Sequence, residues 1–290
     1  MSSLKRLPSW LQQELPVSSF CETSAFVSKF AVHTVCQEAH CPNITHCFSK
    51  KSMTFLLLGN ICTRSCVFCA VEKNNASVLS VDEDEPFRIR DCVHALGLKY
   101  VVLTSVTRDD LEDGGARIFA RTIELLRAAD QEIKIEVLVP DLEGNVLSIK
   151  SILKAAPDCM GHNIETVQRL SKILRPQSDY ARSLKVIRTI KDCAPQTKVK
   201  SSLMVGLGET EGEVIEAMRD LRAHHCDICT VGQYLAASSR HYPVQEFVSP
   251  AQFARYQEIG RQLGFTRVFC GPKVRSSYYA EDIYQEALHV

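Results

Sequence analysis

Residues 55–69 read Phe55-Leu-Leu-Leu-Gly-Asn-Ile-Cys62-Thr-Arg-Ser-Cys66-Val-Phe-Cys69, and they set the architecture of the chain. An apolar run with the length of a buried strand ends at Gly59 and leads into a loop with three cysteines. Three thiolates can hold three irons of a [4Fe–4S] cube and leave the fourth iron open. Two other interpretations are zinc, which usually takes four protein ligands, and a ferredoxin site, which supplies four cysteines per cube.

A second group of three cysteines lies upstream of the first. Cys36, Cys41 and Cys47 have the spacing C-x4-C-x5-C, which is too wide for a zinc knuckle, and the group ends just before the expected first strand. Two groups so close together in sequence predict two clusters. Each cluster would lack one ligand if only cysteine counted. We call each group of three cysteines a triad.

The spacing C-x3-C-x2-C of residues 62–69 resembles the cluster loop of radical S-adenosylmethionine (SAM) enzymes, in which SAM binds the open iron. The two triads together resemble the lipoyl synthase family, whose members insert two sulfur atoms into a protein-bound octanoyl chain. Further similar segments run in order along nearly the whole chain: 100–105, 108–115, 162–166, 175–176, 200–210, 232–235 and 275–278.

The resemblance implies a role for each triad, and we therefore call Cys62, Cys66 and Cys69 the radical triad and Cys36, Cys41 and Cys47 the auxiliary triad. The radical triad would hold the cluster that cleaves SAM, and the auxiliary triad would hold the cluster that donates sulfur. The missing ligand of the auxiliary cluster would be Ser277, the second serine of Arg275-Ser-Ser-Tyr278. Serine oxygen is a harder donor than a thiolate, which suits a cluster that is dismantled during turnover. The same motif also fits a helix N-cap ahead of residues 278–287.

The resemblance also implies a set of residues around SAM, namely Phe68, Thr104, Ser105, Asn163, Glu165 and Gly206. Phe68 corresponds to an aromatic position near the adenine, and Asn163 and Glu165 suit hydrogen bonds to the ribose and amino acid parts of SAM. Gly206 would let the backbone approach the cofactor closely. Phe68 also fits a core position, and Glu165 also fits the first turn of a helix, where an acid is favoured by the helix dipole.

Short apolar segments alternate with longer helical patterns from residue 54 onward. The expected strands are 54–58, 100–104, 133–139, 159–162, 198–205 and 228–233. Such alternation predicts an α/β fold with a parallel sheet and right-handed crossovers. Six units are fewer than the eight of a closed barrel, which indicates a partial (β/α)6 TIM-like barrel of the radical SAM type. Residues 1–51 and 271–290 would be extensions of a barrel formed by 52–270, both folding over its mouth.

The family's reaction implies the cofactors and partners. A deoxyadenosyl radical made from SAM would remove hydrogen from C6 and then C8 of an octanoyl-lysine group, and each carbon would take a sulfur atom. Two [4Fe–4S] clusters and SAM are the cofactors implied. The partners implied are octanoylated carriers, such as the lipoyl domains of 2-oxoacid dehydrogenases and the glycine-cleavage H protein, and a ferredoxin or flavodoxin reductant.

Three departures from the family pattern lie near the expected substrate side. Thr107 replaces a common Asp, Ser202 replaces a common Gly, and residues 235–241 lack the usual Pro and Lys. A paralogous radical SAM sulfurtransferase that acts on another acyl chain or carrier is therefore an alternative. Enzymes like biotin synthase or the methylthiotransferases would explain the radical triad alone, and an iron–sulfur electron carrier would need two complete four-cysteine sites.

The composition narrows the possible classes of protein and the possible compartments. The formal net charge is zero, so nothing favours binding to nucleic acid or to an anionic membrane. No apolar run approaches the roughly 20 residues of a membrane span, and residues 1–20 contain no recognisable targeting segment. The thirteen cysteines are clustered as in metal sites rather than spread as in a disulfide framework, which predicts a reducing compartment such as the cytoplasm. Cys226 and Cys229, which follow two histidines, lead into an expected strand and are not expected to form a third metal site.

Overall fold

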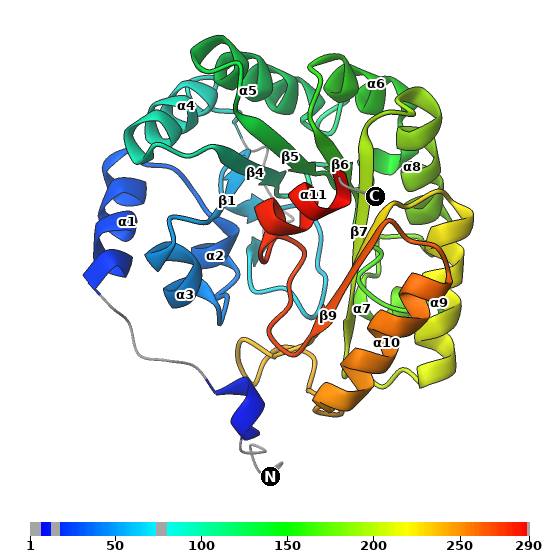
Figure 1. The fold of residues 1–290 in the computed structure, drawn as a ribbon. Helices are drawn as coiled ribbons and strands as arrows, with labels where there is room; N and C mark the ends of the chain where they lie inside the picture. Colours follow the sequence, from blue (N-terminus) through cyan, green and yellow to red (C-terminus); the bar gives the residue numbers. More distant parts are fainter. Residues whose placement is uncertain (1–6, 13–17, 74–79, 289–290) are drawn as a thin grey trace.

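The computed structural model describes residues 7–12, 18–73 and 80–288 (Figure 1). Its main sheet has seven strands in the order β1 (Thr54–Leu57), β4 (Tyr100–Ser105), β5 (Lys134–Leu138), β6 (Cys159–Gly161), β7 (Lys198–Val205), β8 (Ile228–Gln233) and β9 (Arg267–Gly271). All neighbouring strands are parallel, so their carboxyl ends meet at one end of the molecule, which we call the mouth. Two short strands, β2 (Ile61–Cys62) and β3 (Glu72–Lys73), pair beside the mouth.

Helices surround the strands on their outer side (Figure 1). They are α4 (Glu85–Leu96), α5 (Ala116–Ala129), α6 (Val146–Lys154), α7 (Gln168–Leu174), α8 (Tyr180–Cys193), α9 (Glu211–Ala223) and α10 (Pro250–Gln262). Short 3-10 turns form at η1 (Ser9–Leu11) and η2 (Leu142–Gly144). None of the helices in the part of the chain that the structure describes has the length and apolar character needed to cross a membrane.

The sequence pattern explains why these elements form. All four residues of β1 are buried, as expected for a strand covered on both faces. In α5, Ile118, Phe119, Ile123 and Leu126 are buried and recur at helical spacing, so a single face of the helix packs on the sheet. The N-terminus of α9 is fixed by a capping box between Thr210 and Glu213.

The expected α/β fold is confirmed, and each of the six expected strands is present. The strand β9 was not expected from the sequence, because its five residues mix buried and half-buried positions. No hydrogen-bonded ladder joins β1 to β9 among the described residues, so these two strands are the edges of an open barrel. The division at residues 51 and 270 into extensions and barrel stays a prediction.

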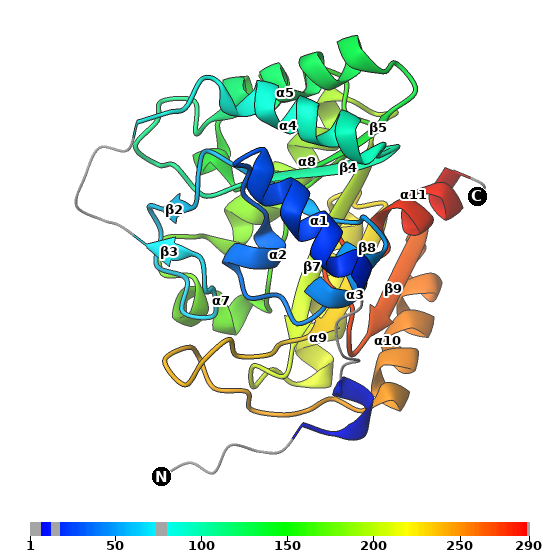
Figure 2. The same cartoon turned by 90° about the vertical axis from the view of Figure 1, so that its left-hand side faces the viewer.

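The segment before the barrel covers one of these edges. It contains α1 (Ser18–Lys29), α2 (Val35–Glu38) and α3 (Ile44–Ser49), which lie beside β1 in Figure 1 and form one group nearest the viewer in Figure 2. Thr34 forms an antiparallel bridge with Phe55, and the amide of Leu56 donates to the carbonyl of His33 at 2.9 Å. The edge of β1 is therefore paired rather than open to another chain.

The C-terminal segment follows β9 past the mouth and ends in α11 (Ala280–Leu288), which packs at the other end of the strands. Ile283 and Ala287 pack on Ile228, the first residue of β8. The ring of Tyr284 lies 5.7 Å from that of Tyr100, the first residue of β4. The C-terminal helix therefore covers the amino ends of the strands, and of the described residues after β9 only 272–279 remain at the mouth.

Candidate active site

The radical triad follows a tight turn at the end of β1. Leu58 and Gly59 both have left-handed backbone angles, with φ of 67° and 77°. Their two amides donate to the carboxylate of Glu85, at 2.7 Å and 3.1 Å. Glu85 is buried at the start of α4, so this helix determines where the cysteine loop leaves the sheet.

Three backbone contacts hold the loop of the radical triad from different sides. The amide of Thr63 donates to the carbonyl of Thr107, after β4, at 3.0 Å. The amide of Val67 donates to the carbonyl of Leu174, at the end of α7, also at 3.0 Å, and the carbonyl of Val67 accepts from Tyr242 at 3.0 Å. The loop is therefore preorganised by segments from separate βα units.

The side chain of Arg64 holds the same loop in place through buried hydrogen bonds. Its guanidinium is 3% exposed and makes two 2.7 Å hydrogen bonds to Asp109 and a third, also of 2.7 Å, to Asp141. Arg182 donates to the other oxygen of Asp141 at 2.9 Å. Burial opposes ionisation of Asp141, but hydrogen bonding and charge from Arg64 outweigh it and lower the pKa to about 2. Arg64 was not among the site residues expected from the sequence, since its position between two cysteines does not reveal that its side chain is buried.

The three thiols of the radical triad lie near enough to affect one another electrostatically. Burial raises the pKa of Cys69 to about 12, and the charges of Cys66 and Cys62 add to the rise. Burial also raises the pKa of Cys66, whereas the neighbouring Arg175 opposes that rise. All three are free thiols, so iron binding would release protons from them. The donor set fits a cluster with one iron left open.

The auxiliary triad is formed around two short helices. Cys36 lies in α2, whose N-cap Thr34 accepts from the amide of Gln37, and Cys47 lies in α3. The amide of Cys41 donates to the carbonyl of Cys36 at 3.0 Å. Burial raises the pKa of Cys36 and of Cys47 to about 12, and the charge of Cys41 adds to both. These three free thiols also fit an iron–sulfur cluster.

An iron–sulfur cluster and a single metal ion require different arrangements of their protein ligands. In the described residues, no three His, Cys, Asp or Glu side chains converge on one point as a lone ion requires. Each thiolate of a cube binds a different iron, so the ligands of a cluster stand apart. The part of the chain that the structure describes therefore offers no ready-made single-ion site for zinc. Cys226 and Cys229 are buried, and the thiol of Cys226 donates to the carbonyl of Ile228 at 3.2 Å.

Residues 273–279 meet the N-terminal segment at the auxiliary triad, as expected, whereas α11 does not fold over the mouth. The side-chain amide of Asn43 donates to the carbonyl of Lys273 at 2.6 Å, and Nε2 of His46 lies 3.2 Å from the hydroxyl of Tyr279. The ring of His46 also lies 5.9 Å from that of Tyr278. Ser277 therefore lies in a segment packed against the triad. Because α11 begins at Ala280, Ser277 is not its N-cap residue.

Asn163 and Glu165 come together at the end of β6. The amide of Asn163 donates to the carboxylate of Glu165 at 3.1 Å, and burial raises the pKa of Glu165. Glu165 has a left-handed φ of 65° and lies ahead of α7, which begins at Gln168, so the first-turn interpretation is wrong. Nη1 of Arg175 donates to the carbonyls of Asn163 and Ile164, at 3.3 Å and 3.1 Å.

The remaining residues expected around SAM have different surroundings. Ser105 Oγ is buried at the end of β4 and has no hydrogen-bond partner within the described residues, as a ligand-binding hydroxyl would. The hydroxyl of Thr104 instead donates to the carbonyl of Leu138 at 2.7 Å. Phe68 is half-buried and packs on the core. At Gly206, where φ is 92°, a Cβ would lie 2.2 Å from Nε2 of Gln233, so packing alone already demands glycine.

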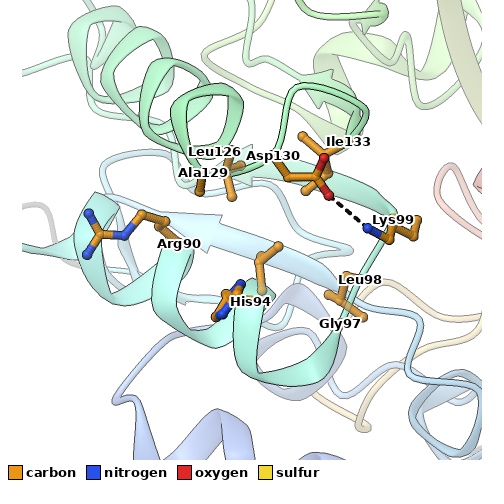
Figure 3. Close-up of a pocket in the computed structure, with 10 residues that line it drawn as sticks. Arg90, His94, Gly97, Leu98, Lys99, Leu126, Ala129, Asp130 and Ile133 are labelled. Atoms are coloured by element: carbon orange, nitrogen blue, oxygen red, sulfur yellow. Dashed lines mark hydrogen bonds and ion pairs between the residues drawn. The ribbon is translucent and has the colours of Figure 1, made fainter.

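A groove between α4 and α5 lies away from this site (Figure 3). Its lining includes His94, Leu98 and Lys99, and Lys99 pairs with Asp130 at 2.8 Å. Lys99 directly precedes β4, so the groove is at the amino ends of the strands. It shares no residue with either triad.

The partial barrel and the three-thiol loop at its mouth define a radical SAM enzyme. Residues 56–221 match the sequence model of the Radical SAM superfamily. The fold resembles that of methylornithine synthase (TM-score 0.58, 13% identity, 71% of this chain and 61% of that chain). It also resembles the FeFe-hydrogenase maturase HydG from Carboxydothermus hydrogenoformans (TM-score 0.58, 16% identity, 80% of this chain and 56% of that chain).

Curated relatives narrow this class. The lipoyl synthase of Caldanaerobacter subterraneus subsp. tengcongensis is 50% identical over 276 residues, which cover 95% of this chain and 96% of the relative. The lipoyl synthase of Caldicellulosiruptor bescii is 48% identical over 283 residues, which cover 97% and 96%. That of Geotalea daltonii is 48% identical over 278 residues, which cover 96% and 94%. The chain belongs to the lipoyl synthase family.

Family membership confirms the enzyme class and the cofactors expected from the sequence. The protein is a radical SAM enzyme that inserts sulfur, with SAM and two [4Fe–4S] clusters as cofactors. Its substrate is a protein-bound octanoyl group.

Proposed function

We propose that the radical triad holds the cluster that binds and cleaves SAM, and that the auxiliary triad with Ser277 holds the cluster that donates sulfur to C6 and C8 of octanoyl-lysine. The observation that supports this best is that the segment with Ser277 contacts both the auxiliary triad's segment and Asn163, while Cys66 of the radical triad lies close enough to Glu165 to feel its charge. A radical generated at one site must reach a chain that also touches the sulfur donor. Such a reaction requires close and fixed placement of all three.

The chain's own residues would bind and orient the reactants. Asn163 and Glu165 would hold the ribose and amino acid parts of SAM, Ser105 would offer its buried hydroxyl, and Phe68 would lie near the adenine. Gly206 would keep the turn after β7 close to SAM, and Thr104 would support the wall behind it. Cys62, Cys66 and Cys69 would hold the cluster that, when bound and reduced, would supply the electron for breaking the carbon–sulfur bond of SAM.

The partners extend the same proposal. The carriers are lipoyl domains of 2-oxoacid dehydrogenases and the glycine-cleavage H protein, which would present the octanoyl-lysine arm to the mouth. The electron donor is a ferredoxin or a flavodoxin. Free thiols at all described cysteines support a reducing compartment, for which we propose the cytoplasm.

An anaerobic single-turnover assay tests the function. The reconstituted protein is mixed with SAM, a strong reductant and an octanoyl-lysine peptide, and peptide mass and protein iron are read together. We expect the peptide to gain two sulfur atoms while the auxiliary cluster loses iron. Deoxyadenosine without a sulfurated peptide would contradict the proposed substrate and leave SAM cleavage in place.

Ser277→Ala tests the fourth ligand of the auxiliary cluster. We expect the variant to lose auxiliary iron and the sulfurated product but to keep forming deoxyadenosine, because the radical triad is intact. Unchanged cluster content and unchanged product yield would rule out ligation by Ser277.

A further inference from the structure

The segment that carries Ser277 is held from two sides before it reaches that serine. The carbonyl of Lys273 accepts from Asn43, which lies between two cysteines of the auxiliary triad. At Gly232, near the end of β8, an added Cβ would lie 2.0 Å from the carbonyl oxygen of Val274. Residues 273 and 274 are therefore clamped between the N-terminal segment and the barrel wall.

The next serine reaches the opposite side of the mouth. Ser276 Oγ donates to Oδ1 of Asn163 at 3.1 Å, across 113 positions of sequence. Nδ2 of the same amide donates to Glu165 at 3.1 Å. A continuous hydrogen-bonded chain thus runs from the residue beside Ser277 to the two side chains proposed to bind SAM.

The far end of this chain is rigidly supported. Arg175 holds the carbonyls of Asn163 and Ile164, and the amide of Met204 donates to the carbonyl of Glu165 at 2.8 Å. Arg175 itself is 7% exposed. The backbone after β6 is fixed in this way and cannot shift to compensate for a rotation of the Asn163 side-chain amide. Such a rotation would therefore break or re-form the hydrogen bond to Ser276.

We propose that Ser276 is a positioning residue that couples the SAM site to the auxiliary triad. SAM bound against Asn163 and Glu165 holds the amide with its oxygen toward Ser276, which orders residues 272–279 and presents Ser277 to the triad. Coupling between two sites is reciprocal, so an ordered tail favours SAM by the same factor. Whichever of the two events comes first, SAM binding or ligation by Ser277, bears the entropy cost of ordering the tail. The second event then no longer bears that cost. This inference rests on the proposed roles of Asn163, Glu165 and Ser277.

The test compares the holoenzyme with Ser276→Ala, Ser276→Thr and a matched control, Ser238→Ala. The hydroxyl of Ser238 bonds to His241 within the loop after β8, 2.9 Å away, so the control removes a hydroxyl at the mouth without touching the tail. Calorimetry under anaerobic conditions gives the affinity for SAM. Hydrogen exchange of the peptide covering residues 272–279, with and without SAM, reports the order of the tail.

We expect SAM to slow exchange of the tail in the wild-type and Ser238→Ala enzymes. Ser276→Ala should bind SAM about three- to tenfold more weakly, as for the loss of one neutral hydrogen bond, and should lose the slowing. Ser276→Thr keeps a hydroxyl and should restore both. If Ser276→Ala also loses auxiliary iron, rescue by threonine still supports coupling, and failure of that rescue overturns it.

Asn163→Ala distinguishes an error in the coupling from an error in the site. Suppose that Asn163→Ala weakens SAM binding but Ser276→Ala keeps the wild-type affinity for SAM and the wild-type slowing of tail exchange. The coupling alone is then overturned. If Asn163→Ala leaves SAM affinity unchanged, the assignment of this residue to SAM fails and the coupling falls with it.

Discussion

Arg64 lies between two cysteines that would bind iron, yet its side chain turns away into a buried set of charges. It pairs with Asp109 and Asp141, and Arg182 balances the second carboxylate. Removing one partner of a buried ion pair leaves an uncompensated charge and is more costly than losing a surface pair. We therefore assign Arg64 to holding the loop of the radical triad in place.

Arg64→Met should lower stability by about 3 kcal/mol and release iron from the radical triad, because the loop loses its anchor. Arg64→Lys keeps the charge but cannot bridge two carboxylates, so it should retain an intermediate amount of iron. Iron content after gel filtration and deoxyadenosine yield measure the effect. Lys200→Met is the control, since it breaks a 2.8 Å buried pair with Glu136 elsewhere in the barrel. Equal loss of radical-cluster iron in both variants would mean that instability alone is responsible.

His162 should make the free energy of unfolding depend on pH. It is buried between the carbonyl of Val139, at 2.9 Å, and the hydroxyl of Ser183, at 3.0 Å. Burial lowers its pKa from 6.5 to about 4. Below pH 6.5 the unfolded chain takes up a proton that the folded chain does not, so this contribution to stability falls as the pH drops toward 4, by up to about 3 kcal/mol.

The comparison with His162→Gln isolates this group from other titrating residues. We expect the wild-type protein to be the more stable at pH 7, and the difference in urea midpoint to shrink at pH 5. A difference that stays constant between the two pH values would show that His162 is not the group responsible.

The turn after β7 packs closely against a second loop, and this packing gives Gly206 a structural role. Sequence reasoning placed Gly206 where the backbone would approach a cofactor. In the structure, Gln233 and the carbonyl of Glu246 already occupy the space beside it, with the carbonyl 2.4 Å from an added Cβ. The loop after β8 is therefore locked onto this turn by the absence of a side chain.

Gly206→Ala should destabilise the protein by about 1–3 kcal/mol and increase hydrogen exchange in residues 242–248, because the loop must move away. Gly212→Ala is the control, since nothing lies within 4 Å of its added Cβ and it is within α9. It should raise stability by about 0.5–1 kcal/mol. Unchanged exchange in residues 242–248 of the Gly206 variant would contradict the packing explanation.

The elements themselves were predicted unevenly. Strands with continuous apolar runs, such as β1 and β7, were found because two-sided burial leaves a clear signature. The edge strand β9 was missed because only part of it is buried. The alternative interpretation of Arg275-Ser-Ser-Tyr278 as a helix N-cap would start the C-terminal helix at residue 278. The helix starts at Ala280, and Tyr278 and Tyr279 instead pack near His46.

For the whole molecule, the two triads should be separable because each is built on its own segment. We expect Cys47→Ala to lose half of the iron and the sulfurated product but to keep SAM cleavage. Cys66→Ala should also lose half of the iron and should lose SAM cleavage entirely. Cys226→Ala, at a buried thiol outside both triads, should keep all the iron. Iron content and deoxyadenosine yield measure these effects, and loss of both clusters in either triad variant would contradict separate sites.

The sequence by itself determined the family, both groups of cysteines and the parallel α/β architecture. Such features depend on residue type, spacing and hydrophobic period, which are local properties. The tertiary structure alone revealed the anchor at Arg64, the turn held by Glu85 and the link from Ser276 to Asn163. These depend on burial and on contacts between residues up to 113 positions apart. Chain folding sets such contacts through the packing of separate βα units, and no local pattern records them.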